Sequence, residues 1–233
     1  METLASQLPI YTNTARTIAP QNRLIASESS QFSAENQNTD RSADSFRNAG
    51  YTSAQLNGSL GSAGALLGQA SNDLSRIGDA LDEIDALVTI AEENSDLSTQ
   101  QRAQLNAQIE DYLTRIDDIA ANSSFEGRDL LASDQTITLQ VGTGTSSDNR
   151  IDIDLSASGS EDLATGLSEI NVSDSAGVSN ARTLVDQAQE ALRDREISVA
   201  ADQGSLRTAQ EQNRVSQVAG ENIVQAQLAA SET

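Results

Sequence analysis

The fold is decided by residues 60–91, LGSAGALLGQASNDLSRIGDALDEIDALVTIA, in which one apolar pattern repeats every seven residues. Leucine or valine occupies positions 60, 67, 74, 81 and 88, and alanine or isoleucine follows three residues later in each repeat. Two apolar positions per heptad over five heptads indicate a long helix with one seam buried against neighbouring helices. We therefore expect a helix over about residues 60–94.

A second helix is expected over about residues 99–121. Its apolar positions alternate by four and three, as one helix face requires: Leu105, Ile109, Tyr112, Ile116 and Ile119. Ser98 or Thr99 is suited to be its N-cap. Because the connection to the first helix is short, the two helices should form an antiparallel hairpin.

The apolar period changes to two in TITLQV (136–141) and RIDIDL (150–155), which predicts two strands. The polar, glycine-containing segment between them predicts a turn, so we expect one β-hairpin over about 136–155. Residues 156–177 are expected to be a loose linker. A last helix is expected over about 178–230, where Val185, Leu192, Val199 and Leu206 again show heptad spacing.

Composition excludes several classes of function. The chain has 35 acidic and 14 basic residues, a formal net charge of −21, and every basic residue is arginine. Such a surface repels nucleic acids and anionic membranes. Histidine and cysteine are absent, which removes imidazole bases, thiol nucleophiles, disulfides and the usual zinc sites. No apolar run has the length of a membrane span. We expect no enzymatic activity and no cofactor.

Residues 1–57 are expected to form a separate polar segment. The stretch SESSQFSAENQNTDRSADSFRNAG (27–50) has few apolar positions on any helix face. This composition is typical of a segment that is disordered or marginally helical until it assembles with a partner. The expected architecture of residues 58–233 is mainly α, an elongated antiparallel helical rod with one small β-hairpin.

One group of acidic residues is a candidate metal site, because calcium prefers several carboxylate oxygens. It consists of Asp148, Asp152 and Asp154. They lack the spacing of an EF-hand or of a calcium-binding β-repeat. Alternation with isoleucine also places Asp152 and Asp154 on the solvent face of a strand. The sequence therefore favours no metal site here.

ANSSFEGRDLLASD (121–134) interrupts the pattern between the second helix and the hairpin. Phe125 is one of only three phenylalanines in the chain. We expect it to plug the turn at the end of the helix pair, with Gly127 adopting a positive φ. Neither residue is expected to bind a ligand.

In this order, these segments resemble the core of bacterial flagellin from about Leu60 to Gln227. The two antiparallel helices are followed by a motif that resembles the family's, Asn-x-x-Phe-x-Gly-x-x-Leu-Leu, which runs here from Asn122 to Leu131. The hairpin and the segment NARTLVDQAQEALRDREISVAADQGSLRTAQEQNRVSQVAGENIVQAQ (180–227) are also similar to flagellin. The resemblance implies a flagellin-core-like fold.

The resemblance further implies a structural subunit of the bacterial flagellar filament, exported by the flagellar type III route and located outside the cell. It would serve motility by self-assembly with other flagellin-like subunits, with a flagellar export chaperone and hook-associated proteins as further partners. Two alternatives stay open. One is a hook–filament junction protein, and the other is a non-polymerising secreted binding module derived from flagellin.

Two departures from the family bear on assembly. Flagellins usually begin with a heptad-patterned helix and an Arg-Leu-Ser-Ser-Gly tract, whereas here Arg23-Leu24 are followed by IASESS. A typical flagellin also continues with a further helix that pairs with the N-terminal one, whereas this sequence stops at Thr233. We therefore expect assembly to differ from that of the standard filament.

A receptor-binding or protofilament-packing face is implied by the resemblance at Glu83, Leu87 and Gln108. In the family, a basic residue at the first position, a leucine at the second and an acidic residue near the third contribute to recognition by a vertebrate innate receptor. Only the leucine is kept here, so weak or absent receptor activation is expected.

The proposed intramolecular packing residues come from all three helices. In the first helix they are Leu67, Leu74, Ile77, Leu81, Ile84 and Val88, which should contact Tyr112, Ile116, Leu192 and Val199. Because carboxylates are in large excess, assembly is expected to require high salt, which screens repulsion between subunits.

Overall fold

The computed structural model describes residues 54–142 and 147–231. The chain divides into two compact units, and Ser53–Gln217 form the unit described below. Of the other unit, the described part is residues 218–231, the last part of a long helix. The predictions for residues 1–53 lie outside the described residues.

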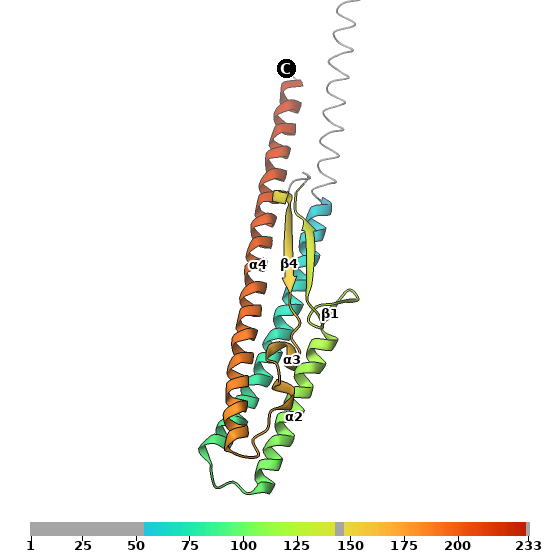
Figure 1. The fold of residues 1–233 in the computed structure, drawn as a ribbon. Coiled ribbons are helices and arrows are strands. Elements are labelled where there is room, and N and C mark those ends of the chain that lie inside the picture. The colour runs from blue at the N-terminus through green and yellow to red at the C-terminus, as the bar shows by residue number, and fades with distance from the viewer. Residues whose placement is uncertain (1–53, 143–146, 232–233) are drawn as a thin grey trace, which may run out of the picture. The chain divides into compact units, whose positions relative to one another are not determined.

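Three long helices form the main unit (Figure 1). The first is helical over residues 54–93 and is called the first core helix. It includes residues 54–57, which the sequence assigned to the polar segment. The other two are α2 (Thr99–Asn122) and α4 (Ser175–Ser231). The mainly α fold and its antiparallel helices are as predicted.

The start of α2 confirms Ser98 as the N-cap. The Ser98 hydroxyl accepts a hydrogen bond from the main-chain N–H of Gln101 at 3.3 Å, and the Gln101 side chain accepts one from the Ser98 N–H at 2.9 Å. This reciprocal capping box satisfies two N–H groups that the helix cannot satisfy internally.

Side-chain hydrogen bonds between α4 and the first core helix show that the two helices are antiparallel. Gln203 donates to the carbonyl of Leu67 at 3.4 Å, and Gln210 donates to the carbonyl of Leu60 at 3.4 Å. As the residue number rises by seven along α4, the partner's number falls by seven. The two heptad patterns are therefore aligned in register and face each other.

The predicted hairpin is present as β3 (Gln135–Gln140) and β4 (Arg150–Leu155), with a short 3-10 helix η1 (Ser147–Asn149) before β4. The strands are antiparallel, and Ile137 lies opposite Ile153. Ile153 and Leu155 are buried, whereas the residue between them is exposed. The alternating pattern thus packs one face of the hairpin on the helices.

A second, smaller hairpin was not predicted. It consists of β1 (Ser124–Phe125) and β2 (Arg128–Asp129), joined by Glu126 and Gly127. Both turn residues have positive φ, 50° and 78°, as a two-residue type I′ turn requires. Two-residue strands are too short to show apolar alternation, so no periodicity could indicate them.

The prediction of a loose linker is wrong. Residues 156–174 contain the short helices α3 (Ser160–Leu163) and η2 (Leu167–Glu169), and they bury a row of apolar side chains. That row consists of Leu163, Ala164, Leu167, Ile170 and Val172. Its irregular spacing matches neither a helix nor a strand, which hid it from periodicity.

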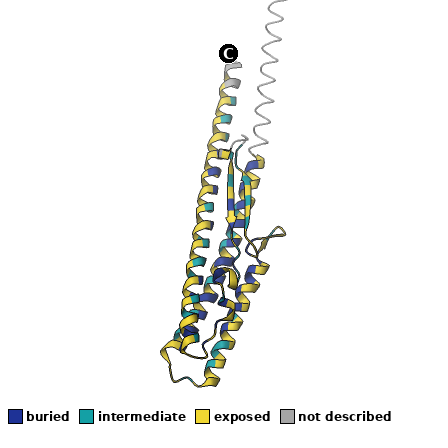
Figure 2. Cartoon of the chain, in the orientation of Figure 1, coloured by how far each residue is buried: buried dark blue, intermediate teal, exposed yellow. Residues whose placement is uncertain are grey.

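One hydrophobic cluster joins the three helices, the β3–β4 hairpin and the linker (Figure 2). Its fully buried large side chains are Leu60, Leu67, Leu74, Ile77, Leu81, Ile84, Ile109, Ile116, Leu130, Leu131, Ile153 and Leu167. Within the described ranges, none of the helices has an apolar stretch long enough to cross a membrane.

Candidate functional site

The proposed packing residues of the first core helix lie in the centre of the cluster. Leu67, Leu74, Ile77, Leu81, Ile84 and Val88 have no exposed surface. From the other helices, Ile116 is fully buried, and Leu192 and Val199 are 5% and 3% exposed. Gly78 brings the helices close together, because a Cβ there would lie 3.3 Å from the Leu192 side chain.

The aromatic residues lie at the edge of this core. Tyr112 and Phe125 are half-buried and pack against the cluster from outside. Phe125, expected to plug the turn, is in contact with the cluster without being fully buried, and Leu130 and Leu131 take the fully buried positions in this segment. Gly127 is exposed, and its positive φ is as expected.

A buried carboxylate fixes the end of α2 to the first core helix. Asp73 is 2% exposed and accepts hydrogen bonds from Gln69 at 2.9 Å and Ser123 at 2.8 Å. Arg76 forms an ion pair with it at 3.0 Å. Three donors compensate the loss of water around this charge. Ser123 is the C-cap of α2, so the bond sets where α2 ends.

An arginine near the start of α4 ties it to the far end of the first core helix. Arg182 forms an ion pair with Asp85 and another with Glu92 at 3.2 Å, and it donates to the Thr89 hydroxyl at 2.6 Å. These three partners are spaced by four and three along one helix face. They match the fork of donors on a guanidinium.

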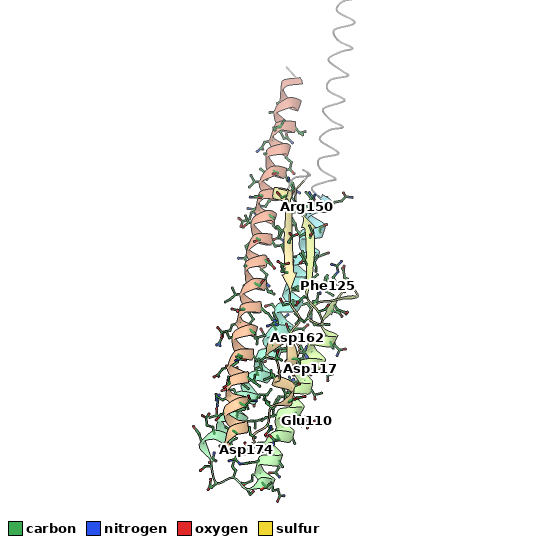
Figure 3. All side chains as sticks on the ribbon, viewed as in Figure 1. Glu110, Asp117, Phe125, Arg150, Asp162 and Asp174 are labelled. Carbon is green, nitrogen blue, oxygen red and sulfur yellow. The ribbon has the colours of Figure 1, made fainter. Side chains whose placement is uncertain are left out.

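The linker is held on its α2 side by polar side chains. Asp117 accepts from the Ser160 N–H at 2.7 Å and from its hydroxyl at 3.1 Å, which caps α3 (Figure 3). Further along, Asn106 accepts from the Val172 N–H at 2.8 Å, and Arg102 donates to the Val172 carbonyl at 2.9 Å. Main-chain groups of the linker are thus paired with side chains of α2.

Arg195 holds the linker on its α4 side. It donates to the carbonyls of Ala157 at 2.9 Å and Asp162 at 2.8 Å. Burial lowers the pKa of Arg195, while the carboxylates of Asp162, Asp134 and Asp194 raise it. An arginine stays charged throughout the working pH range. Both of its bonds are therefore charge-assisted.

Glu161 closes the turn that follows α3. Its carboxylate accepts from the N–H of Gly166 at 3.0 Å and from the N–H and hydroxyl of Ser168. The bond from Gly166 is the main reason that the pKa of Glu161 lies below its usual value, followed by the Ser168 hydroxyl. The exposed side chain thus shapes the turn rather than a binding site.

An open groove of about 780 Å³ lies beside β3. Its apolar lining comes from Leu66 on the first core helix, Phe125 on β1, and Ile137, Leu139 and Ile153 on the β3–β4 hairpin. Glu126 and Arg128, on the β1–β2 hairpin, also line it. The half-buried state of Phe125 follows, since one side of its ring faces this groove.

The face implied at Glu83, Leu87 and Gln108 is only partly presented. Glu83 and Gln108 are exposed, whereas Leu87 is 9% exposed and belongs to the hydrophobic cluster. Asp85 beside them is engaged by Arg182. Leu87 therefore offers little surface to a partner in this conformation.

The acidic strand positions are engaged by threonines. Thr138 donates to Asp152 and Thr136 donates to Asp154, each at 2.7 Å across the hairpin. Asp148 lies in η1, and its side chain is outside the described residues. In the described part of the chain, no group of three or more acidic side chains is placed to hold a metal ion.

The residues that pattern reasoning missed are polar: Asp73, Arg182, Asp117, Asn106 and Arg195. Each acts through hydrogen bonds to residues far away in sequence, at separations from 33 residues for Arg195 to 97 residues for Arg182. A single sequence carries no periodic signal for such pairs.

Known proteins resemble this chain in structure. A flagellin from Bacillus cereus matches 66% of this chain and 86% of its own, with 21% identity and a TM-score of 0.55. A putative flagellar hook-associated protein from Vibrio parahaemolyticus matches 76% of this chain and 93% of its own, with 11% identity and a TM-score of 0.63. No protein-family model and no curated protein matches the sequence. The fold is flagellin-like.

Proposed function

We propose that this chain is a structural subunit of the bacterial flagellar filament, exported through the flagellar apparatus and assembled outside the cell. One observation carries the proposal: three antiparallel helices, sealed by the heptad seam of residues 60–91, reproduce the fold of a flagellin over most of that flagellin's length. The work of such a protein is packing against other subunits.

Unpartnered apolar positions on α4 support packing against further subunits. Ile197 and Val215 are 66% and 67% exposed. They are separated by about five helical turns, so they lie on the same face of α4. Beyond the seam that packs on the first core helix, α4 thus presents two outward apolar side chains on one face in the main unit.

Electron microscopy of the purified full-length protein tests the proposal. We expect filaments in concentrated salt, and we expect the double substitution Ile197→Gln, Val215→Gln to abolish them while circular dichroism and thermal melting stay unchanged. Ser198→Gln is the matched control, an exposed change one residue further along the same helix. Filaments that are equally abundant in both variants would remove the role of this face, and monomers under every condition would contradict a filament subunit.

The hook–filament junction is the second candidate, and the higher TM-score to the hook-associated protein favours it. The two roles differ in copy number and in the shape of the assembly. Short caps or rings in the same micrographs, instead of long filaments, would decide for the junction. Quantifying the chain in sheared extracellular filaments against the dominant flagellin gives an independent measure of its copy number.

A further inference from the structure

The β3–β4 hairpin has two outer edges. Each of its strands pairs only with the other among the described strands. Val141 donates its N–H to the carbonyl of Asn149 at 2.7 Å. Because bonded and non-bonded pairs alternate in an antiparallel ladder, Thr136 and Thr138 must point their N–H and C=O groups away from β4.

The two edges differ in what covers them. On the β4 side, the Asp154 N–H donates to the carboxylate of Asp202 on α4, and β4 lies next to α4 in Figure 1. On the β3 side, no hydrogen bond from another described element reaches the main chain of Thr136 or Thr138. The β3 edge is therefore the open one.

The β3 edge also lacks the usual protection against pairing. Natural edge strands are commonly shielded by charged side chains, proline or a bulge. Residues 135–147 contain no charged residue and no proline, although the chain carries 35 acidic and 14 basic residues. Pairing with β4 runs without a bulge from Gln135 to Gln140. An unprotected edge of this kind can form main-chain hydrogen bonds with a strand of another molecule.

The surface beside this edge is partly apolar and carries no net charge, and its polar part includes Gln55, Ser59 and Ser62 of the first core helix. Ile137 and Leu139 of β3 line the groove described above, together with Phe125. The charges at the groove are Glu126 and Arg128, which cancel. In a chain of net charge −21, a strand without charged side chains repels a second acidic molecule less than a strand that carries carboxylates.

We propose that the β3 edge pairs with the β3 edge of a second copy of this chain, antiparallel and about a two-fold axis. The two hairpins then form one four-stranded sheet in the order β4–β3–β3–β4. Thr136 of each copy exchanges main-chain hydrogen bonds with Thr138 of the other, because these are the residues whose N–H and C=O groups point outward. Ile137 lies opposite Ile137 at the axis, on the groove side.

The carboxylates of the two copies lie far apart in this pairing. The Asp152 carboxylate of one copy is separated from the Asp154 carboxylate of the other by three strand spacings, about 14 Å. That separation exceeds the Debye length of about 8 Å at physiological ionic strength. The pair is closed by its two-fold axis and does not propagate, so the proposal does not rest on assembly into a filament.

Disulfide trapping in the full-length chain tests the register. Ile137→Cys introduces a single thiol, because the sequence has no cysteine of its own. Opposed residues of a non-hydrogen-bonded pair have Cα atoms about 4.5 Å apart, which is within disulfide range. Mild oxidation should give a covalent dimer that dithiothreitol dissociates. Asp152→Cys, on the other strand of the same hairpin, is the control and should stay monomeric.

Proline substitution tests the edge itself by sedimentation equilibrium. Thr138→Pro removes an outward N–H from the open edge, and Asp152→Pro removes the opposed N–H on the β4 side. Both abolish the Thr138–Asp152 side-chain bond, and neither N–H takes part in the ladder between the two strands. We expect Thr138→Pro to weaken dimerisation at least about tenfold and Asp152→Pro to leave it within about twofold.

Two results would overturn the pairing. One is an equal effect of the two proline substitutions, and circular dichroism of both variants establishes that their helices are intact. The other is a wild type that is monomeric at every concentration, together with an Ile137→Cys variant that forms no cross-link.

The same variants separate the pairing from the proposed function. Filaments formed by Thr138→Pro would show that filament assembly does not need the β3 edge. A wild type that dimerises but never forms filaments, with Ile137→Cys trapped as a covalent dimer, would count against the proposed function alone.

Discussion

The first core helix and the linker after β4 are both buried against the same cluster, yet different physical means hold them. The helix buries one apolar residue every three or four positions along residues 54–93, and its backbone bonds are satisfied internally. The linker has little regular structure, so its main-chain groups need external partners. Asp117, Asn106 and Arg195 supply them.

This difference explains what could be predicted from the sequence. Heptad and alternating patterns report burial directly, so the three helices, a cap at Ser98 or Thr99 and the β3–β4 hairpin follow from residue order. The linker depends on bonds between residues far apart in sequence, and nothing in a single sequence marks Arg195 as the partner of the Ala157 carbonyl. Sequence reasoning therefore mistook a held segment for a loose one.

The candidate surfaces divide in the same way. That the heptad positions are interior was predictable, and so was the turn at Gly127. The partial burial of Phe125 was not predictable, because it depends on whether Leu130 and Leu131 take the fully buried positions in this segment. The open β3 edge was also hidden, since it follows from which strand α4 covers.

The largest loss of stability is expected from a substitution in the helical seam. Leu74→Ala removes a side chain with no exposed surface from the centre of the cluster. Such a substitution should lower the free energy of unfolding by about 3 kcal/mol or more, as the transfer and cavity terms add. Chemical denaturation measures it. Ile197→Ala, at a 66% exposed position, is the control and should change stability by less than about 0.5 kcal/mol.

A smaller and local effect is expected in the linker. Arg195→Met keeps the apolar stem but leaves the carbonyls of Ala157 and Asp162 without their charged donor. We expect a loss of about 2 kcal/mol and faster amide hydrogen exchange around residues 157–164. Arg193→Met, an exposed arginine on the same helix, is the control. Uniformly faster exchange across all helices would show that Arg195 supports the whole fold instead.

Substitution of two glycines compares a turn with a helix. Gly127→Ala places a side chain at φ 78° in the β1–β2 turn and should cost about 1 kcal/mol, although nothing lies within 4 Å of its Cβ. Gly204→Ala on α4 also meets nothing within 4 Å and should stabilise by up to about 1 kcal/mol. Thermal melting of both variants shows whether each substitution stabilises or destabilises the protein. An unchanged melting temperature for Gly127→Ala would contradict a type I′ turn at Glu126-Gly127.

The smallest effect concerns Asp202, which faces β4 from α4. Burial raises its pKa, and one carboxylate oxygen is buried without a hydrogen bond in the described chain. The folded state therefore binds this proton more readily than the unfolded state. Stability in the wild type is penalised above the folded-state pKa and recovers as the pH falls through it.

Asp202→Asn should consequently stabilise the protein at neutral pH, by less than about 1 kcal/mol, because the group is only partly buried. Its advantage should shrink as the pH is lowered toward the folded-state pKa. Asp186→Asn, at an exposed position of α4, controls for the general gain from removing one negative charge. An advantage that grows on acidification would contradict the assigned direction of the pKa shift.

The central claim is that this flagellin-like chain assembles by helix packing once its charge of −21 is screened. Sedimentation of purified full-length protein across a sodium chloride series tests it most directly. The Debye length falls from about 10 Å at 0.1 M salt to about 3 Å at 1 M. The pelletable fraction should therefore rise steeply over this range and fall again when the salt is diluted. A pelletable fraction that is independent of salt, or protein that stays in the supernatant throughout, would contradict the account.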